Sequence, residues 1–432
     1  MKKLKIELLL TGNELVSGDV VDTNSAFIAQ QLGELGLEVA RRVTLKDDTE
    51  LLTEEIIHLS QRSDILIING GLGPTVDDMT AQALADAANL PISCHPKAIA
   101  HLEHWCQKRG FELDGPNKKQ AMLPQGCDIL ANKNGSAVGF SLTLNNCIVF
   151  TTPGVPHELK TMLNDEIIPK LRQYSDSVHT TDVSRFLVFG LGESTIQGLV
   201  DKHLPDWPAD IELGFRAARP YVEIKLTSHA KSAHQTKVSW QQKLEELLGA
   251  HIIGPDKTTV EQSLVETLNR KKQSVTFAES CTGGLMASKL TSVPGSSSVF
   301  GAGFVTYSNE IKHQVLDVDQ QVLSIHGAVS QPVVEQMLQG ALRHSQADYG
   351  VAVSGIAGPT GGSDEKPVGL VWIAWGDKDN HQSIALYIPV ERHYFQHYVA
   401  TVGLDLVKRH IKQIDEQPLY LVSRQFKPNQ TY

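Results

Sequence analysis

Apolar residues in the first part of the chain fall into two alternating patterns. Residues 6–12 and 64–71 are short apolar runs that end in glycine, which is typical of buried strands followed by tight turns. Residues 23–35 and 50–60 have apolar positions at helical spacing, and residues 37–43 indicate a further strand. Strands that alternate with helices predict a doubly wound α/β domain, with a mainly parallel sheet and helices on both faces.

The pattern changes twice further along the chain. From about residue 175 to 255 strands and helices mix without a dense motif, and a long polar helical pattern covers residues 231–248. We interpret this stretch as a small α+β module that connects domains or supports dimerisation. A Gly-Pro-Asp turn at 254–256 is the expected boundary. The predicted parts are residues 1–172, 173–255 and 256–420.

A second alternation of strands and helices follows this boundary. Residues 259–271, 331–344 and 394–412 have helical spacing, and residues 274–279 form an apolar run that ends at a polar, glycine-rich turn. The C-terminal part is therefore expected to be another α/β domain. In such sheets ligands bind at the carboxyl ends of the strands, so the informative loops are those that follow strands.

Composition and charge narrow the classes of function. The 432 residues carry 39 Lys and Arg against 49 Asp and Glu, which gives a formal net charge of -10. This balance argues against non-specific binding of nucleic acid, which requires a basic surface. It leaves open a small phosphate-bearing ligand, which needs only a few local donors. We therefore expect small-molecule nucleotide substrates and no nucleic-acid partner.

The location of the protein is expected to be the cytoplasm. Lys5 and Glu7 interrupt the apolar run near the N-terminus, which argues against a signal peptide. No run of about 18 apolar residues is present, so we expect no membrane partner. The five cysteines form no CxxC pair, and neither a disulfide framework nor a zinc ribbon is indicated.

Polar and glycine residues follow three of the expected strands of the N-terminal domain. Glycines there let the backbone approach a ligand closely, and their N–H groups can face phosphate oxygens. A structural role as turns and helix caps is the alternative for each residue taken alone. The candidate substrate-binding residues of this site are Gly12, Asn13, Glu14, Asn24, Gly70, Gly71, Gly73 and Thr75.

Carboxylates in these loops predict a divalent metal ion. Glu14, Asp47 and Asp78 are the candidate ligands, and Asp47 and Asp78 are also candidate catalytic residues. Phosphates and several carboxylates in one pocket repel one another unless a cation such as Mg²⁺ bridges them. A metal-dependent pyrophosphate hydrolase is therefore a reasonable class for this domain.

The C-terminal part holds a candidate nucleophile on a turn between a strand and a helix. Ser280 and Cys281 compete for this role, with Lys312 as a candidate base and Tyr307 close to it in sequence. A solvated Lys312 without a catalytic role is about equally compatible with the pattern. The expected oxyanion donors are N–H groups near Thr282, Gly283 and Gly284. A second glycine-rich loop and a later arginine are candidates for binding a phosphate: Ser354, Gly355, Gly358 and Arg392.

The motifs of both parts resemble those of the CinA family. In the N-terminal part they are Gly-Asn-Glu-Leu at 12–15 and Gly-Gly-Leu-Gly-Pro-Thr-x-Asp-Asp-x-Thr at 70–80, within a match that spans most of residues 5–170. In the C-terminal part they include Ala-Glu-Ser-Cys-Thr-Gly-Gly at 278–284 and the Pro-Gly-Ser-Ser run that contains Ser297, within a match over about 258–415. Val138, Ser354 and the Val-Glu-Arg run at 390–392 depart from the family pattern.

The resemblance implies two activities and a homodimer. The N-terminal domain of that family is a molybdopterin-binding-like, metal-dependent ADP-ribose pyrophosphatase, and its distant relatives bind molybdopterin. The C-terminal domain is a nicotinamide mononucleotide amidase that needs no cofactor. By this resemblance Ser280 is the nucleophile, Lys312 and Tyr307 are its catalytic partners, and Ser297 belongs to the substrate site. Two alternatives stay open: a pterin-binding module without hydrolysis, and a regulatory protein linked to competence or DNA damage.

Overall fold

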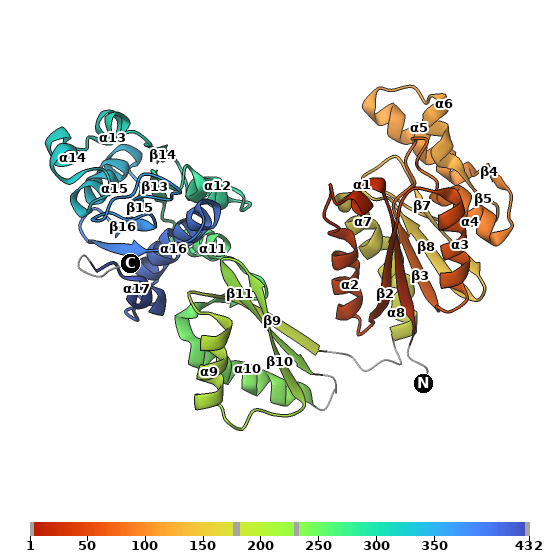
Figure 1. Cartoon of the computed structure of the whole chain (residues 1–432), viewed down its shortest axis with the longest axis horizontal. Helices are drawn as coiled ribbons and strands as arrows, with labels where there is room; N and C mark the ends of the chain where they lie inside the picture. The colour runs from red at the N-terminus through yellow and green to blue at the C-terminus, as the bar shows by residue number, and fades with distance from the viewer. Residues whose placement is uncertain (1–3, 176–181, 229–232, 428–432) are drawn as a thin grey trace. The chain divides into compact units, whose positions relative to one another are not determined.

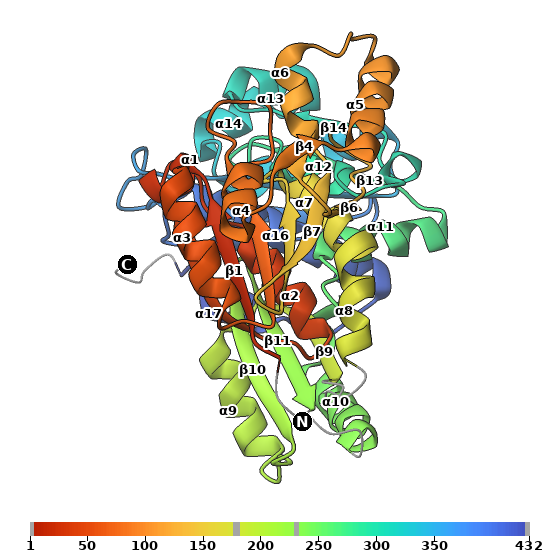
Figure 2. The same cartoon turned by 90° about the vertical axis from the view of Figure 1, so that its right-hand side faces the viewer.

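The chain forms two compact units in the computed structural model, which describes residues 4–175, 182–228 and 233–427. The first unit contains the N-terminal domain up to residue 182, and the second contains residues 183–228 and 233–432 (Figures 1 and 2). The second unit thus combines the middle module with the C-terminal part. The start of the expected helix over 231–248 lies outside the described residues; the described helix is α10 (His234–Leu248).

The N-terminal unit is built on a six-stranded sheet in the order β2-β1-β3-β8-β7-β6. The first four strands of this order are parallel, and β7 and β6 are antiparallel. The mainly parallel sheet predicted from the sequence is therefore confirmed. The bounds are β1 (Ile6–Thr11), β2 (Val39–Leu45), β3 (Ile65–Asn69), β6 (Asp128–Leu130), β7 (Gly139–Leu144) and β8 (Cys147–Thr152), with a separate pair β4 (Ile92–Cys94) and β5 (Met122–Pro124).

Helices cover both faces of this sheet because its strands are apolar on both sides. Leu9 and Ile68 join a core with α3, α4 and α5, whereas Leu8 and Ile67 join a core with α2, α7 and α8 (Figure 1). The domain is thus doubly wound. The helices are α1 (Asn13–Ser17), α2 (Asn24–Glu34), α3 (Thr49–Ser60), α4 (Thr80–Ala88), α5 (Pro96–Arg109), α6 (Gly115–Lys118), α7 (Pro156–Met162) and α8 (Ile168–Ser175).

The middle module is a four-stranded sheet with two helices on one face. Its elements run β9 (Asp182–Phe189), α9 (Glu193–His203), β10 (Ile211–Ala218), β11 (Tyr221–Ser228), α10 and β12 (Ile252–Pro255). The sheet order β10-β11-β9-β12 and this βαββαβ succession are those of a ferredoxin-like unit. Ile196 of α9 and Leu244 of α10 pack against Val188 and Ile224, so both helices lie on the same face.

The C-terminal part has a five-stranded sheet in the order β14-β13-β15-β16-β17. Strands β14, β13 and β15 are parallel, and β16 and β17 continue the sheet antiparallel. Helices α11, α12 and α16 pack on one face and α13, α14 and α15 on the other. The bounds are β13 (Val275–Glu279), β14 (Gly303–Val305), β15 (Tyr349–Gly355), β16 (Leu370–Gly376), β17 (His381–Tyr387), α11 (Val260–Lys271), α12 (Leu285–Thr291), α13 (Asn309–Leu316), α14 (Gln320–His326), α15 (Gln331–Ser345), α16 (Arg392–Lys412) and α17 (Leu419–Arg424).

The middle module and the C-terminal part share one hydrophobic core. The face of the module that its own helices leave open carries Phe189 and Tyr221, which pack with Tyr398 of α16 and Tyr420 of α17. The ring of Phe189 lies 5.2–5.9 Å from the three tyrosine rings, centroid to centroid. This packing explains why the two parts form one compact unit, while the three-part division drawn from the sequence stays a prediction.

No helix among the described residues is both long enough and apolar enough to span a membrane.

Candidate functional site

The turn after β13 presents Ser280 at the carboxyl end of the C-terminal sheet. Ser280 N–H donates to the carbonyl of Val353, which extends the pairing of β13 with β15 by one residue. Gly283 and Gly284 then take φ angles of 65° and 98°, in the left-handed region that favours glycine. These glycines turn the chain sharply into α12. The strand-turn-helix arrangement expected around Ser280 is therefore present.

A buried carboxylate holds this turn in place. Glu279, the last residue of β13, is 1% exposed, and its side chain accepts hydrogen bonds from the N–H groups of Gly284, Met286 and Ala287 at 2.9–3.1 Å. It thereby satisfies N–H groups at the start of α12 that have no partner within the helix. Glu279 fixes the position of the next residue, Ser280.

Lys312 lies next to the Ser280 hydroxyl. Its Nζ atom is 3.0 Å from Ser280 Oγ, and it donates to the carbonyls of Thr306 at 2.8 Å and Tyr307 at 3.2 Å. The lysine side chain is 1% exposed, so the reading of Lys312 as a solvated helix residue is wrong. Helix α13, which carries it, packs against α15 and begins at a Ser308 cap.

Burial prepares Lys312 to act as a base. Loss of hydration disfavours the ammonium form and lowers the pKa of Lys312 to about 8. A general base works best when its pKa lies near the operating pH. The neutral amine of Lys312 can therefore take the proton of Ser280 Oγ under ordinary conditions.

Burial favours the reactive, neutral form of Lys312, but it disfavours the reactive, charged form of the neighbouring thiol. Cys281 is 4% exposed, and burial raises the pKa of its thiol to about 12, so it stays protonated near neutral pH. Its carbonyl accepts a hydrogen bond of 2.8 Å from Gln396 of α16. Of the two candidate nucleophiles, Ser280 is the one within hydrogen-bond distance of Lys312 among the described residues.

Cys281→Ala is accordingly expected to leave the chemistry at Ser280 within about tenfold of the parent rate, which corresponds to ~1.4 kcal/mol of packing disturbance. The thiol contributes to the core beside the turn and carries no charge at neutral pH. The measurement is the rate of ammonia release from nicotinamide mononucleotide. A loss of a thousandfold in this variant would indicate a thiol nucleophile instead.

The predicted partners Tyr307, Gly358 and Arg392 meet beside this turn. Arg392 at the start of α16 donates to the Gly358 carbonyl at 2.8 Å and to the Tyr307 hydroxyl at 3.0 Å. Tyr307 is 61% exposed and reaches Lys312 through its backbone carbonyl. The arginine thus ties together the loop after β14, the loop after β15 and α16. The guanidinium and the phenol are placed to bind a substrate, and the catalytic role of the Tyr307 hydroxyl stays a prediction.

Two of the expected oxyanion donors are engaged elsewhere. The Gly283 N–H donates to the Ser280 carbonyl at 3.1 Å, and the Gly284 N–H donates to Glu279. The expectation that these two N–H groups stabilise an oxyanion is therefore not supported. Thr282 has a different position, because among the described residues its buried hydroxyl finds no hydrogen-bond partner. That hydroxyl is enclosed by protein atoms, so a role in contacting a substrate stays a prediction.

Other predicted residues of this half lie in two places. Ser354, near the end of β15, donates its hydroxyl to the Ala328 carbonyl at 2.7 Å, and Gly355 packs its Cα face against β16. Ser297 is at the other end of β13, because Val299 pairs with Val275, the first residue of that strand. The structure therefore does not bring Ser297 together with Ser280 within one chain.

The loops of the N-terminal site meet at one edge of the first sheet. Asp47, after β2, accepts hydrogen bonds from Thr11 Oγ1 at 2.5 Å and from the Asn13 N–H at 3.0 Å. Asn24 donates to Asn69 at 2.9 Å and to the Gly154 carbonyl at 2.6 Å. These contacts join the carboxyl ends of β1, β2, β3 and β8, as expected for parallel strands.

The glycine-rich loop after β3 closes on itself through Asp78. Gly70 has a φ of 112°, and a Cβ there would lie 2.4 Å from the Thr11 carbonyl, so only glycine allows this approach. Asp78 accepts from the Thr75 N–H at 2.9 Å and from its hydroxyl at 2.5 Å. Lys119 donates to the Thr75 carbonyl. A cavity of about 100 Å³ lies beside this loop. Its lining includes Gly71 and Gly73 of the loop together with Lys119, Gln120 and Val138.

The three predicted metal ligands do not form a preformed cage. Glu14 lies in α1 beside Gly12, Asp47 is bonded by Thr11 and Asn13, and Asp78 is bonded by Thr75. Across residues 4–175, 182–228 and 233–427, no group of three or more His, Cys, Asp or Glu side chains is placed to hold a metal ion. The chain alone thus does not fit an all-protein metal site. A cation shared between one carboxylate and substrate phosphates stays a prediction.

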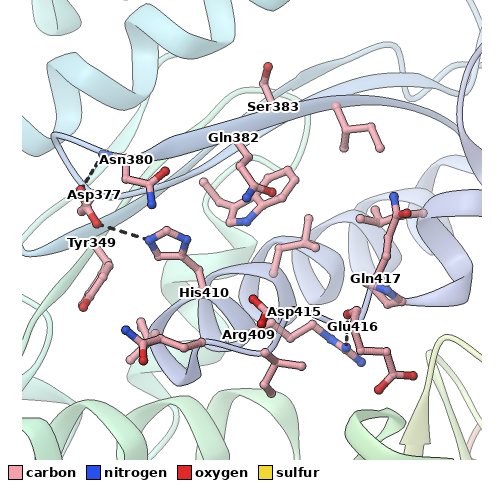
Figure 3. Close-up of a pocket in the computed structure, with 18 of the residues that line it drawn as sticks. Tyr349, Asp377, Asn380, Gln382, Ser383, Arg409, His410, Asp415, Glu416 and Gln417 are labelled. Carbon is pink, nitrogen blue, oxygen red and sulfur yellow. Dashed lines mark hydrogen bonds and ion pairs between the residues drawn. The ribbon is translucent and has the colours of Figure 1, made fainter.

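A larger cavity, of about 950 Å³, lies at the opposite end of the C-terminal sheet from Ser280. Tyr349 begins β15 there, and Asp377 follows β16 (Figure 3). Asp377 pairs with His410 at 3.3 Å, and Arg409 is held by buried Asp405 at 2.8 Å. Two of the charged groups at its wall, Asp377 and Arg409, are thus already paired, and none of the predicted site residues lines it.

Sequence reasoning missed two residues that position the nucleophile. Glu279 stands next to Ser280, yet a single acidic residue at a strand end gives no sign of where its carboxylate points. Gln396 is 115 residues from the Cys281 carbonyl that it binds, and such a contact follows only from the fold. A carboxylate just before a strand-to-helix turn was the one available signal, since acidic groups stabilise helix N-termini.

Comparison with known proteins gives matches over both halves of the chain. Residues 7–173 match a family model described as a probable molybdopterin binding domain, and residues 257–411 match one described as the CinA C-terminal domain. The chain is 52% identical over 429 residues to a CinA-like protein of Colwellia psychrerythraea, covering 99% of each chain. It is 38% identical over 410 residues to a putative competence-damage inducible protein of Caldicellulosiruptor bescii, covering 94% of this chain and 98% of that one.

One solved structure also matches a third of the chain. The competence/damage inducible protein CihA from Agrobacterium tumefaciens aligns at 40% sequence identity with a TM-score of 0.34, over 34% of this chain and 91% of that chain.

Proposed function

Because the chain belongs to the CinA family, we propose that it is a bifunctional hydrolase of nucleotides. The C-terminal part hydrolyses the carboxamide of nicotinamide mononucleotide to give nicotinic acid mononucleotide and ammonia. The N-terminal domain hydrolyses the diphosphate of ADP-ribose to give AMP and ribose 5-phosphate. The observation that carries the proposal is the 3.0 Å contact between Ser280 Oγ and the buried amine of Lys312.

The amide step uses this pair directly. Neutral Lys312 takes the proton of Ser280 Oγ while the oxygen forms a bond to the carboxamide carbon. The lysine then returns that proton to the leaving nitrogen as the C–N bond breaks, so ammonia departs and an ester to Ser280 remains. Water attacks the ester carbon, Lys312 takes a proton from it, and the Ser280 oxygen leaves and is protonated again. The product is a carboxylic acid, and the enzyme returns to its starting state.

Groups around Ser280 support the binding of a nucleotide there. Arg392 and Tyr307 offer donors for a phosphate, and the exposed phenol offers a face for an aromatic ring. These two groups would hold the phosphate end of the substrate.

The pH dependence of amide hydrolysis tests the role of the lysine. Only the neutral form of Lys312 accepts a proton, and its pKa is lowered to about 8. The neutral fraction of Lys312 is about a tenth at pH 7 and grows as the pH rises through 8. Relative to its value at pH 7, kcat/KM should therefore rise about tenfold before it levels off. The measurement is ammonia release between pH 6 and 9. A profile that is flat or falls over this range contradicts a lysine base.

For the N-terminal domain, the glycine-rich loop, Asp78 and Lys119 support phosphate chemistry. The loop brings backbone N–H groups, an ammonium and a carboxylate to one edge of the sheet. A divalent cation would neutralise the diphosphate, held by a carboxylate of this loop together with the substrate's own phosphates. Binding of a pterin cofactor without hydrolysis is the second candidate, and the family model matched over residues 7–173 favours it.

One pair of assays on the purified full-length chain tests both halves of the proposal. Ammonia is measured with nicotinamide mononucleotide, and AMP is measured with ADP-ribose in the presence of Mg²⁺. We expect both products. Release of ammonia without release of AMP would support the amidase, and it would favour pterin binding without hydrolysis by the N-terminal domain. Absence of ammonia from a folded protein would refute the amidase.

A further inference from the structure

A groove of about 540 Å³ lies where the middle module meets the C-terminal part, within the second compact unit. Its walls come from the loop before α9, the turn between β10 and β11, the start of α16 and helix α17 (Figure 1). This volume is in the range of pockets that hold small ligands. It is separate from the Ser280 turn, none of whose residues line it.

Two arginines of this groove lie over tyrosine rings. The guanidinium of Arg219 is 5.4 Å from the ring centre of Tyr394, and that of Arg424 is 5.0 Å from the ring centre of Tyr398. The two tyrosines belong to α16, and their rings are 6.0 Å apart. The arrangement therefore places the positive charges of Arg219 and Arg424 next to an aromatic wall.

The charge of the groove is opposite to that of the whole protein. Among the described residues that line it, no side chain is an aspartate or a glutamate, although the chain carries a formal net charge of -10. The N-terminus of α9, an eleven-residue helix that begins at Glu193, lies on the same wall at Gly192 and Thr195. A Thr195 hydroxyl and a Ser423 hydroxyl complete the polar side. Such a surface favours an anion.

We propose that this groove is a binding site for a nucleoside monophosphate. The half-buried ring of Tyr394 takes the aromatic base, and Arg219, Arg424 and the start of α9 take the phosphate. The site is distinct from both substrate sites described above.

Helix α16 connects the groove to the Ser280 turn. Arg392 and Gln396 contact the Tyr307 hydroxyl and the Cys281 carbonyl, while Tyr394 and Tyr398 line the groove. Residues two apart on a helix point in different directions, so the first turns of α16 serve both sites at once. Occupation of the groove is therefore expected to change the rate of the reaction at Ser280. This second statement rests on the proposed amidase, whereas binding to the groove does not.

The test is photolabelling of the full-length protein with 8-azido-AMP, followed by mass spectrometry of its peptides. We expect label on residues 393–408 or 220–225, reduced at least tenfold by the double variant Arg219→Gln, Arg424→Gln. Arg109→Gln is the matched control, because that guanidinium also lies over an aromatic ring, at 4.2 Å from Trp105, but not in the groove. Circular dichroism verifies folding, and Arg219→Gln alone replaces the double variant if that one is unfolded.

Competition identifies the ligand class. AMP should prevent labelling of these peptides at concentrations where adenosine and ribose 5-phosphate do not. Label only on other segments, label unchanged by the arginine variants, or equal competition by the two fragments would each overturn the proposal.

Saturating AMP should also change the rate of ammonia release about fivefold in the parent and not in the arginine variants. An unchanged rate in a parent protein that is labelled in the groove would overturn the coupling alone.

Discussion

Ser280→Ala should release ammonia from nicotinamide mononucleotide at least about 10³-fold more slowly than the parent protein, because nucleophile and base act as a unit. The hydroxyl is the only part of Ser280 that the change removes, and it lies 3.0 Å from the Lys312 amine. The backbone bond from Ser280 to Val353 remains, so the turn keeps its place in the sheet. AMP release from ADP-ribose should be unchanged.

Substitutions of Lys312 test whether this residue accepts a proton or only supplies a positive charge. Lys312→Met should lose a similar factor, and the double variant with Ser280→Ala should be little worse than either single variant. Lys312→Arg keeps the charge and the donors but cannot be deprotonated in a protein, so it should be equally inactive. Lys289→Met is the matched control, since Lys289 is also largely buried and pairs with Glu261 at 3.6 Å. More than a tenth of parent activity in Lys312→Arg would rule out the lysine as base.

Asp78→Ala is expected to abolish AMP release from ADP-ribose and to leave ammonia release near the parent rate. Asp78 holds the glycine-rich loop through Thr75 and supplies the carboxylate next to the cavity. Removal of this carboxylate takes away both the hydrogen bonds that shape the loop and a negative charge. The two proposed sites lie in different compact units, so the second unit should keep its fold.

Asp78→Asn distinguishes these two contributions. The amide oxygen can still accept the bonds from Thr75, while the charge needed to hold a cation is gone, so a loss of about 10²-fold or more should persist. Asp86→Ala serves as control, because this carboxylate on α4 only accepts from the exposed Gln82 side chain. Chelation of divalent cations should likewise stop AMP release and spare ammonia release. AMP release by Asp78→Ala at the parent rate would remove this residue from the mechanism.

Local sequence patterns predicted several of the elements that the structure contains. The glycine-terminated run at 64–71 became β3 (Ile65–Asn69), and the last helix, expected from 394, begins at Arg392. The strand expected at 37–43 is displaced to Val39–Leu45, since Leu37 is used for the core and pairing with β1 begins at Val39. Apolar spacing determines which segment is buried, whereas strand pairing determines where an element begins and ends.

Contacts between distant segments set the limit of prediction at the site. The Ser280–Lys312 pair was one of two evenly weighed interpretations, because a sequence does not tell whether a lysine is buried. Lys312 is enclosed only when β14 and α13 are laid beside β13. In the first domain, by contrast, the sequence indicated a set of metal ligands that the described residues do not bring together. Asp47 and Asp78 follow strands as a ligand pair should, yet Asp47 is bonded by Thr11 and Asn13 of the neighbouring loop, and Asp78 is bonded by Thr75 of its own loop.

The shared core of the second unit also constrains the order in which the chain can fold during synthesis. The ferredoxin-like module leaves the ribosome early, but the partners of Phe189 and Tyr221 are Tyr398 and Tyr420, close to the end of the chain. The N-terminal unit can close its cores from its own residues, as domains that fold in succession do. The module instead carries an uncovered apolar face while the 165 residues from 256 to 420 are translated. A ribosome that stalls before α17 would therefore expose the uncovered apolar face of the module to chaperones.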